Sequence, residues 1–134
     1  MSNNLNDLIK IHGNPDSLID HHSSEYGYAI WGFEECFYQI GNESFYNGDK
    51  INCNSFDKLQ DLIDIWVKSN NDIKTLGFLS YDIKNMIYPH IPFKKTKSNF
   101  PYFWFGKPKI IKPYFINHNY SNGENSFLSK IKDI

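Results

Sequence analysis

The segment 55–69 carries the strongest structural signal in this sequence. Its apolar residues recur at intervals of three and four positions, which places them on one face of an α-helix. These residues are Phe56, Leu59, Leu62, Ile63, Trp66 and Val67. Ser55 is expected to cap the N-terminus, because its hydroxyl can accept a hydrogen bond from a free helical N–H group. We therefore predict an amphipathic helix that packs on one side of a sheet.

Short apolar segments alternate with turn-forming residues before this helix. A glycine occurs in each of the expected reversals, at 32–35, 41–43 and 47–49. This spacing is typical of antiparallel strands joined by hairpin turns. The strands expected from it are 26–31, 36–40 and 44–46.

A buried strand is expected after the helix, at 75–80. Gly77 would allow a neighbouring backbone to approach this strand closely. The strand should end because Asp82 can offer its carboxylate to the free N–H groups of a short helix at 83–87. Pro89 would end that helix.

Two further strands are expected at 102–105 and 109–117, and a last helix from residue 126. Pro108 and Pro113 cannot donate a backbone hydrogen bond, so the second of these strands should lie at an edge or be irregular. Antiparallel strands with helices packed on one side define an α+β fold.

Length and charge limit the classes of function. The chain has 134 residues, the size of one domain, and a formal net charge of −1 with no arginine. No overall field therefore favours nucleic acid or anionic lipid. The aromatic segment 100–105 has lysines near it, which would suit stacking on single-stranded nucleic acid. A core strand flanked by solvated lysines is the interpretation we favour.

Candidate reactive groups are few. Cys36 and Cys53 form no disulfide framework, and each is expected to be a reduced, partly buried thiol. A nucleophilic role for either would need a histidine within hydrogen-bond reach. The five histidines lack the spacing of a zinc site, so no metal site is expected; they are His12, His21, His22, His90 and His118. Tyr81 and Asp82 could form an acid–base pair, but capping already accounts for Asp82.

No secretory signal peptide and no apolar run of membrane-spanning length occur in the sequence. We therefore expect a cytoplasmic protein that does not associate with a membrane.

Two long phrases suggest a family. LGFLSYDIKNMIYPHIP at 76–92 and FPYFWFGKPKIIKPYFINH at 100–118 resemble a signature of the N-terminal domain of anthranilate synthase component I and aminodeoxychorismate synthase component I. The Ser-Leu-Ile-Asp-His-His motif at 17–22 falls where that family has a leucine-rich motif ending in serine. The resemblance covers roughly residues 16 to 118. Tyr-Asp-Ile-Lys-Asn in the first phrase, with Phe-Pro before and Pro-Lys after the aromatic residues of the second, resembles the para-aminobenzoate branch.

The sequence also departs from the family pattern. His21 stands at or near the serine that contacts a bound tryptophan in relatives. The arginine that often opens the first hairpin strand is absent, and residues 27–29 stand there instead. Tyr88 and Pro89 replace an acidic residue. The C-terminal domain that carries the chorismate and Mg²⁺ sites in the family has no counterpart in this sequence.

The resemblance implies the N-terminal, non-catalytic domain of an aminodeoxychorismate synthase component I-like protein at 16–134, after a loose segment at 1–15. The complete enzyme would aminate chorismate for para-aminobenzoate and folate synthesis, with Mg²⁺ and a glutamine amidotransferase subunit as partner. No catalytic residue is expected in this chain, which alone should be inactive. His21 and Tyr28 are the candidate ligand-binding residues.

Two alternatives remain open. One is the anthranilate branch, in which this domain would carry a tryptophan regulatory site. The other is a free-standing small-molecule-binding or interaction module. If the synthase interpretation holds, the missing half should leave the sheet incomplete, with apolar edges exposed.

Overall fold

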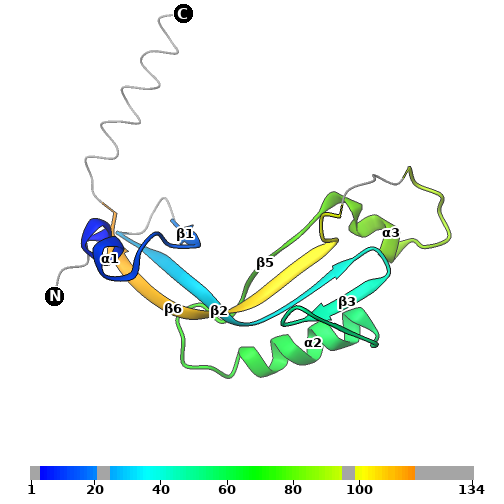
Figure 1. The fold of residues 1–134 in the computed structure, drawn as a ribbon, viewed down its shortest axis with the longest axis horizontal. Helices are drawn as coiled ribbons and strands as arrows, with labels where there is room; N and C mark the ends of the chain where they lie inside the picture. The colour runs from blue at the N-terminus through cyan, green and yellow to red at the C-terminus, as the bar shows by residue number, and fades with distance from the viewer. Residues whose placement is uncertain (1–3, 21–24, 95–98, 117–134) are drawn as a thin grey trace, which may run out of the picture. The chain divides into compact units, whose positions relative to one another are not determined.

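The computed structural model describes residues 4–20, 25–94 and 99–116. Contacts divide the chain into two compact units, one made of 1–31 with 111–134 and the other of 32–110. In chain order (Figure 1), the elements are α1 (Leu5–His12), β1 (Ser17–Ile19), β2 (Tyr26–Ile40), β3 (Glu43–Tyr46), β4 (Asp49–Ile51), α2 (Ser55–Trp66), β5 (Leu76–Leu79), the 3₁₀ turn η1 (Tyr81–Ile83), α3 (Lys84–Ile87) and β6 (Phe103–Phe115).

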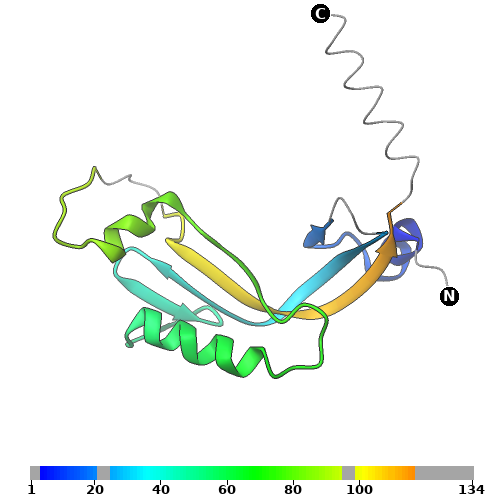
Figure 2. The ribbon, with the colours of Figure 1, turned by 180° about the vertical axis from the view of Figure 1, so that it is seen from behind.

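The strands of the described residues belong to one sheet, in which the order is β4-β3-β2-β6-β5, and β1 pairs in addition with β2. The pairs β1–β2, β2–β3, β3–β4 and β5–β6 are antiparallel. Figure 2 shows β5 running beside the long strand β6. The predicted α+β class is therefore confirmed.

The first unit contains α1, where the sequence had indicated a loose segment. That expectation was wrong for residues 5–12, because Asn4 caps the helix by accepting a hydrogen bond from the N–H of Asn6 at 2.8 Å. The indole of Trp31 holds the far end by donating to the carbonyl of Gly13 at 2.9 Å. His12 lies over the same indole, with 5.0 Å between ring centroids.

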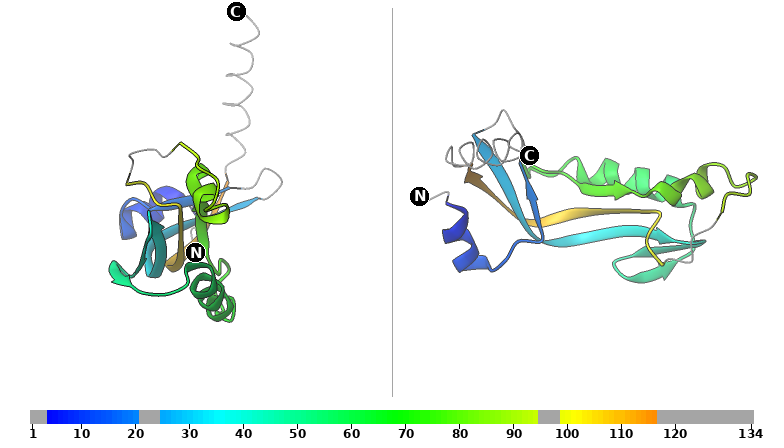
Figure 3. Two further views of the ribbon diagram at one scale, coloured as in Figure 1. Left: turned by 90° about the vertical axis from the view of Figure 1, so that its right-hand side faces the viewer. Right: turned by 90° about the horizontal axis from the view of Figure 1, so that it is seen from above.

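The second unit has its core between α2 and the sheet. Phe37, Leu62, Trp66 and Phe103 form this core and are buried. The rings of Phe37 and Phe103 lie 5.6 Å apart. Figure 3 shows α2 lying beside the strands of this unit. The predicted helix is confirmed, although it ends at Trp66 and its cap is Asn54, which accepts a hydrogen bond from the N–H of Asp57.

Two pairs of predicted strands are each one continuous strand in the structure. The predicted strands 26–31 and 36–40 are one strand, β2, and the hairpin expected between them does not form. Gly32 lies within this strand with a left-handed φ of 72°, which glycine adopts without steric cost. The strands expected at 102–105 and 109–117 are likewise one strand, β6. Pro108 and Pro113 are tolerated there because β5 pairs only with Phe103 to Gly106, so the prolines lie beyond that pairing.

The segment 76–89 also differs in detail from its prediction. β5 is mostly exposed and not buried. Asp82 lies inside η1 and is not a helix cap, and the N-cap positions of η1 and α3 have no side-chain hydrogen bond. Gly77 does permit close approach, as expected, since a Cβ there would collide with the carbonyl of Trp104 and the ring of Phe105.

None of the helices in the described ranges combines the length and apolar composition that crossing a bilayer requires.

The core predicts a sharp contrast between two positions on α2. Replacing Leu62, which is 4% exposed, with alanine should leave a cavity and lower the free energy of unfolding by about 2–5 kcal/mol. The matched change Ile65→Ala alters a side chain that is 61% exposed and should cost about 0.5 kcal/mol or less. Urea unfolding followed by far-UV circular dichroism measures both, and equal losses would contradict the assignment of the buried face.

Candidate functional site

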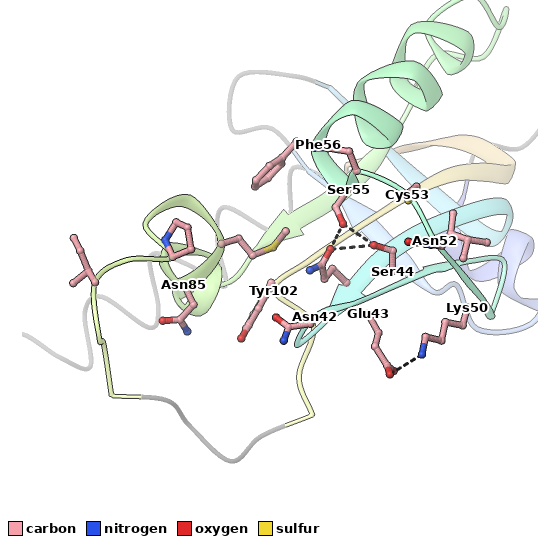
Figure 4. A pocket seen from close by; sticks show the side chains of 16 residues that line it. Asn42, Glu43, Ser44, Lys50, Asn52, Cys53, Ser55, Phe56, Asn85 and Tyr102 are labelled. Atoms are coloured by element: carbon pink, nitrogen blue, oxygen red, sulfur yellow. Dashed lines mark hydrogen bonds and ion pairs between the residues drawn. The ribbon is translucent and has the colours of Figure 1, made fainter.

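The main candidate site is an open pocket of about 890 Å³ in the second unit. It lies among the β3–β4 hairpin, the start of α2, helix α3 and the residue before β6 (Figure 4). Its lining combines polar, mostly uncharged side chains with several apolar ones. The lining residues are Gln39, Asn42, Glu43, Ser44, Lys50, Ile51, Asn52, Cys53, Asn54, Ser55, Phe56, Asn85, Met86, Pro89, Ile91 and Tyr102.

Three polar side chains form a hydrogen-bonded floor in this pocket. The hydroxyls of Ser44 and Ser55 both donate to Oε1 of Gln39, the first at 3.1 Å. The two hydroxyl oxygens are 2.6 Å apart. Gln39 also donates through Nε2 to the carbonyl of Gly41 at 2.9 Å. Gln39 and Ser44 are more than nine-tenths buried, so the floor is a fixed part of the fold.

Strand pairing and strand alternation explain this placement. Gln39 and Ser44 are directly paired residues of β2 and β3. Successive side chains of a strand point to opposite faces, so Gln39 points to the same side as Phe37, which packs in the core. Ser55 is the first residue of α2, so the floor joins the helix to the sheet.

The pocket walls carry amide groups opposite an apolar side. Asn42 follows β2 and Asn85 belongs to α3, and Figure 4 shows them on either side of Tyr102. Phe56 lies above them, on the first turn of α2. At the rim, Lys50 and Glu43 form an ion pair at 2.9 Å, and both side chains are more than half exposed.

A second polar cluster holds the other end of α2. The carboxylate of Glu35 accepts hydrogen bonds from the indole of Trp66 at 2.8 Å and from the hydroxyl of Tyr46. The bond to Glu35 raises the pKa of the Tyr46 phenol, and partial burial adds to that effect. Hydrogen bonds to an ionised carboxylate are among the stronger ones, so this cluster fixes the C-terminal end of α2 against the sheet.

The cysteines are free and partly buried, as predicted. Burial raises the pKa of the Cys36 thiol, which keeps the thiol protonated at neutral pH. The thiolate is the reactive form of cysteine, so Cys36 is poorly suited to nucleophilic chemistry. Cys53 lines the pocket. Within residues 4–20, 25–94 and 99–116, no three side chains of the His, Cys, Asp or Glu type group together so that they could hold a metal ion.

Of the two predicted ligand residues, Tyr28 is described by the structure and does not line this pocket. Tyr28 lies in β2 of the first unit, is partly buried and pairs with Ile19 of β1. His21 falls outside the described residues, so its predicted contact with a ligand stays a prediction. Near Tyr28, the hydroxyl of Tyr114 donates to Asp20. This pair packs so closely over Gly27 that a Cβ there would lie 2.6 Å from Asp20 Oδ1.

Sequence reasoning missed the pocket floor. Gln39, Ser44 and Ser55 belong to three different elements, and no local pattern connects them. The sequence did contain one indication of it. Glu35 and Gln39 lie two residues before and after Phe37, so in a strand their side chains point to the same face as that of Phe37. Two polar residues on an inward-facing row indicate buried partners.

Comparison with known proteins finds similarity at the level of structure. No protein-family model matches the sequence, and no curated protein matches it either. The structure is similar to the crystal structure of anthranilate synthase component I from Streptococcus pneumoniae TIGR4, with a TM-score of 0.51 and 12% sequence identity. The likeness covers 94% of this chain and 34% of that chain. At this identity the likeness shows the fold alone, which is similar to that of part of the synthase component.

Alkaline pH tests the Glu35 cluster. A pKa raised above its ordinary value of 10.0 means that the folded protein holds the Tyr46 proton more tightly than the unfolded chain does. The resulting stabilisation is fully present below pH 10 and is lost as the pH rises through the higher pKa of the folded state. The free energy of unfolding should therefore fall above pH 10, and less steeply in Tyr46→Phe.

Glu35→Gln provides the control for that measurement, because it retains a hydrogen-bond acceptor and removes the charge. Its alkaline loss of stability should also be smaller than that of the unmodified protein. Unfolding midpoints in urea between pH 8 and about pH 11 measure the effect. If the free energy of unfolding falls equally steeply with pH in all three proteins, the Tyr46–Glu35 contact contributes nothing to the alkaline loss of stability.

Proposed function

We propose that this chain is the N-terminal, non-catalytic domain of an aminodeoxychorismate synthase component I-like protein. The observation that carries the proposal is the extent of the fold likeness, which covers 94% of this chain but 34% of the synthase component. A domain that corresponds to part of a larger enzyme is expected to support the fold and partner contacts of that enzyme. The sequence phrases at 76–92 and 100–118 favour the para-aminobenzoate branch.

The exposed edge of the sheet supports this proposal. β5 ends the strand order, and Phe78 and Leu79 on it are 39% and 62% exposed. Phe78 stacks on Phe100, with 5.3 Å between ring centroids, and Phe100 is also exposed. An apolar edge strand invites pairing or packing with another chain segment. We propose that the remainder of the enzyme covers this edge.

The complete enzyme would aminate chorismate with ammonia delivered by a glutamine amidotransferase subunit. Mg²⁺ would neutralise the substrate carboxylate in such an enzyme. The side chains of the described residues do not fit this ion, because they form no cluster of metal-binding groups. The metal and the reactive groups would therefore belong to a C-terminal catalytic domain.

The decisive test is the reading frame that follows codon 134, together with the activity of its product. The proposal requires the frame to continue into a catalytic domain, and the longer protein should consume chorismate when ammonium and Mg²⁺ are supplied. The 134-residue chain alone should leave chorismate unchanged, as measured by chromatography. Turnover by the chain alone, or a natural stop codon after Ile134, would contradict the proposal and favour an independent module.

The anthranilate branch is the second candidate, because the similar structure is an anthranilate synthase component. In that branch the domain would bind tryptophan as a regulator. Titration calorimetry with tryptophan distinguishes the two, since the para-aminobenzoate assignment predicts no binding at micromolar concentrations. Micromolar binding that is lost in Tyr28→Ala would instead establish the anthranilate assignment and support Tyr28 as a ligand residue.

A further inference from the structure

The pocket of the second unit has an electrostatic character that limits its ligand. Among the lining residues that the structure describes, only Glu43 and Lys50 are charged, and they neutralise each other at 2.9 Å. A phosphate or carboxylate would find no unpaired cation in this lining. A ligand that carries a net charge would lose its hydration without gaining an opposite charge in return.

The pocket floor adds a second limit, which follows from counting protons. A serine hydroxyl has one proton and two lone pairs. Ser44 and Ser55 make contacts with Oε1 of Gln39 and with each other, so these contacts use both protons. Most of the lone pairs on the two hydroxyl oxygens remain available. The floor therefore accepts hydrogen bonds from a ligand, which favours hydroxyl or N–H groups over groups that only accept.

The walls indicate the shape of such a ligand. Asn42, Asn52 and Asn85 present carboxamides, each of which can donate and accept. Phe56 and Met86 lie on the same lining and offer an apolar surface. Phe56 is 42% exposed, so part of this side chain can contact a ligand. A flat or puckered ring with polar groups on its rim satisfies both kinds of surface at once.

We propose that this pocket binds an uncharged ring compound that carries several hydroxyl or N–H groups, the chemistry shared by nucleosides and simple glycosides. Its volume of about 890 Å³ is within the range of pockets that hold small molecules. The ring packs on Phe56, its hydroxyl or N–H groups donate to Ser44 and Ser55, and the asparagines bind the remaining polar groups. Tyr28 does not line this site, and the proposal does not depend on the function proposed above.

Ligand titrations followed by two-dimensional NMR of the ¹⁵N-labelled chain test the proposal. The probes are adenosine, uridine and methyl β-glucoside, with adenosine monophosphate as the charged counterpart of adenosine. At least one uncharged probe should shift amide signals of residues around the pocket at concentrations up to about 10 mM. Binding of adenosine or uridine alone assigns the site to nucleosides, and binding of the glucoside alone assigns it to glycosides.

Two variants show whether the binding uses the residues named. Ser55→Ala removes one acceptor of the floor, and Asn85→Ala removes one wall amide without touching the floor. Each should weaken binding roughly five- to thirtyfold, the effect of losing one or two hydrogen bonds. The control Asn70→Ala changes an exposed asparagine that does not line the pocket and should leave binding unchanged.

Any one of three results would overturn the proposal. The first is the absence of signal shifts with all uncharged probes, and the second is tighter binding of adenosine monophosphate than of adenosine. The third is unchanged affinity in both variants. Circular dichroism establishes that each variant is folded. If Ser55→Ala does not fold, Asn85→Ala decides, because its side chain takes no part in the floor.

Discussion

The packing of α2 on Phe37 and Phe103 is the interaction on which the second unit depends. Leu62 and Trp66 bring the apolar side of the helix to these two rings, and all four side chains are at most 4% exposed. An isolated helix of this length is marginal in water, so its stability comes from this contact. The pocket begins at the N-terminal end of the same helix, and its geometry therefore relies on the core.

Polar contacts at the two ends of α2 fix the position of the helix on this apolar core. Along one face of β2, Glu35 binds Trp66 at one end of α2 and Gln39 binds Ser55 at the other end. Phe37, between them in the strand, packs in the core. Hydrophobic burial is not directional, whereas hydrogen bonds require particular partners. The helix thus has one favoured position on the sheet, and the floor of the pocket is one of the two contacts that define it.

The sequence predicted what depends on local pattern and missed what depends on distant contacts. The helix α2 and the α+β class could be predicted because their patterns involve residues that are close together in the sequence. Gly32 was interpreted as a turn, since nothing local distinguishes a left-handed residue inside a strand from one in a hairpin. The floor of the pocket could not be predicted, because Gln39, Ser44 and Ser55 come into contact only when β2, β3 and α2 pack together. The ligand roles of His21 and Tyr28 were inferred from family resemblance and remain predictions.

The row Glu35, Phe37, Gln39 has a consequence for folding fidelity. Sliding β2 by two residues would keep the same side chains facing inward, so alternation alone cannot prevent it. In this chain such a shift would place a carboxylate or an amide beneath the aromatic centre and leave it without its partner. An unpaired buried polar group costs about 1–3 kcal/mol, a large share of the stability of a small domain. The side chains of Glu35 and Gln39 therefore favour one register of β2 over registers shifted by two residues.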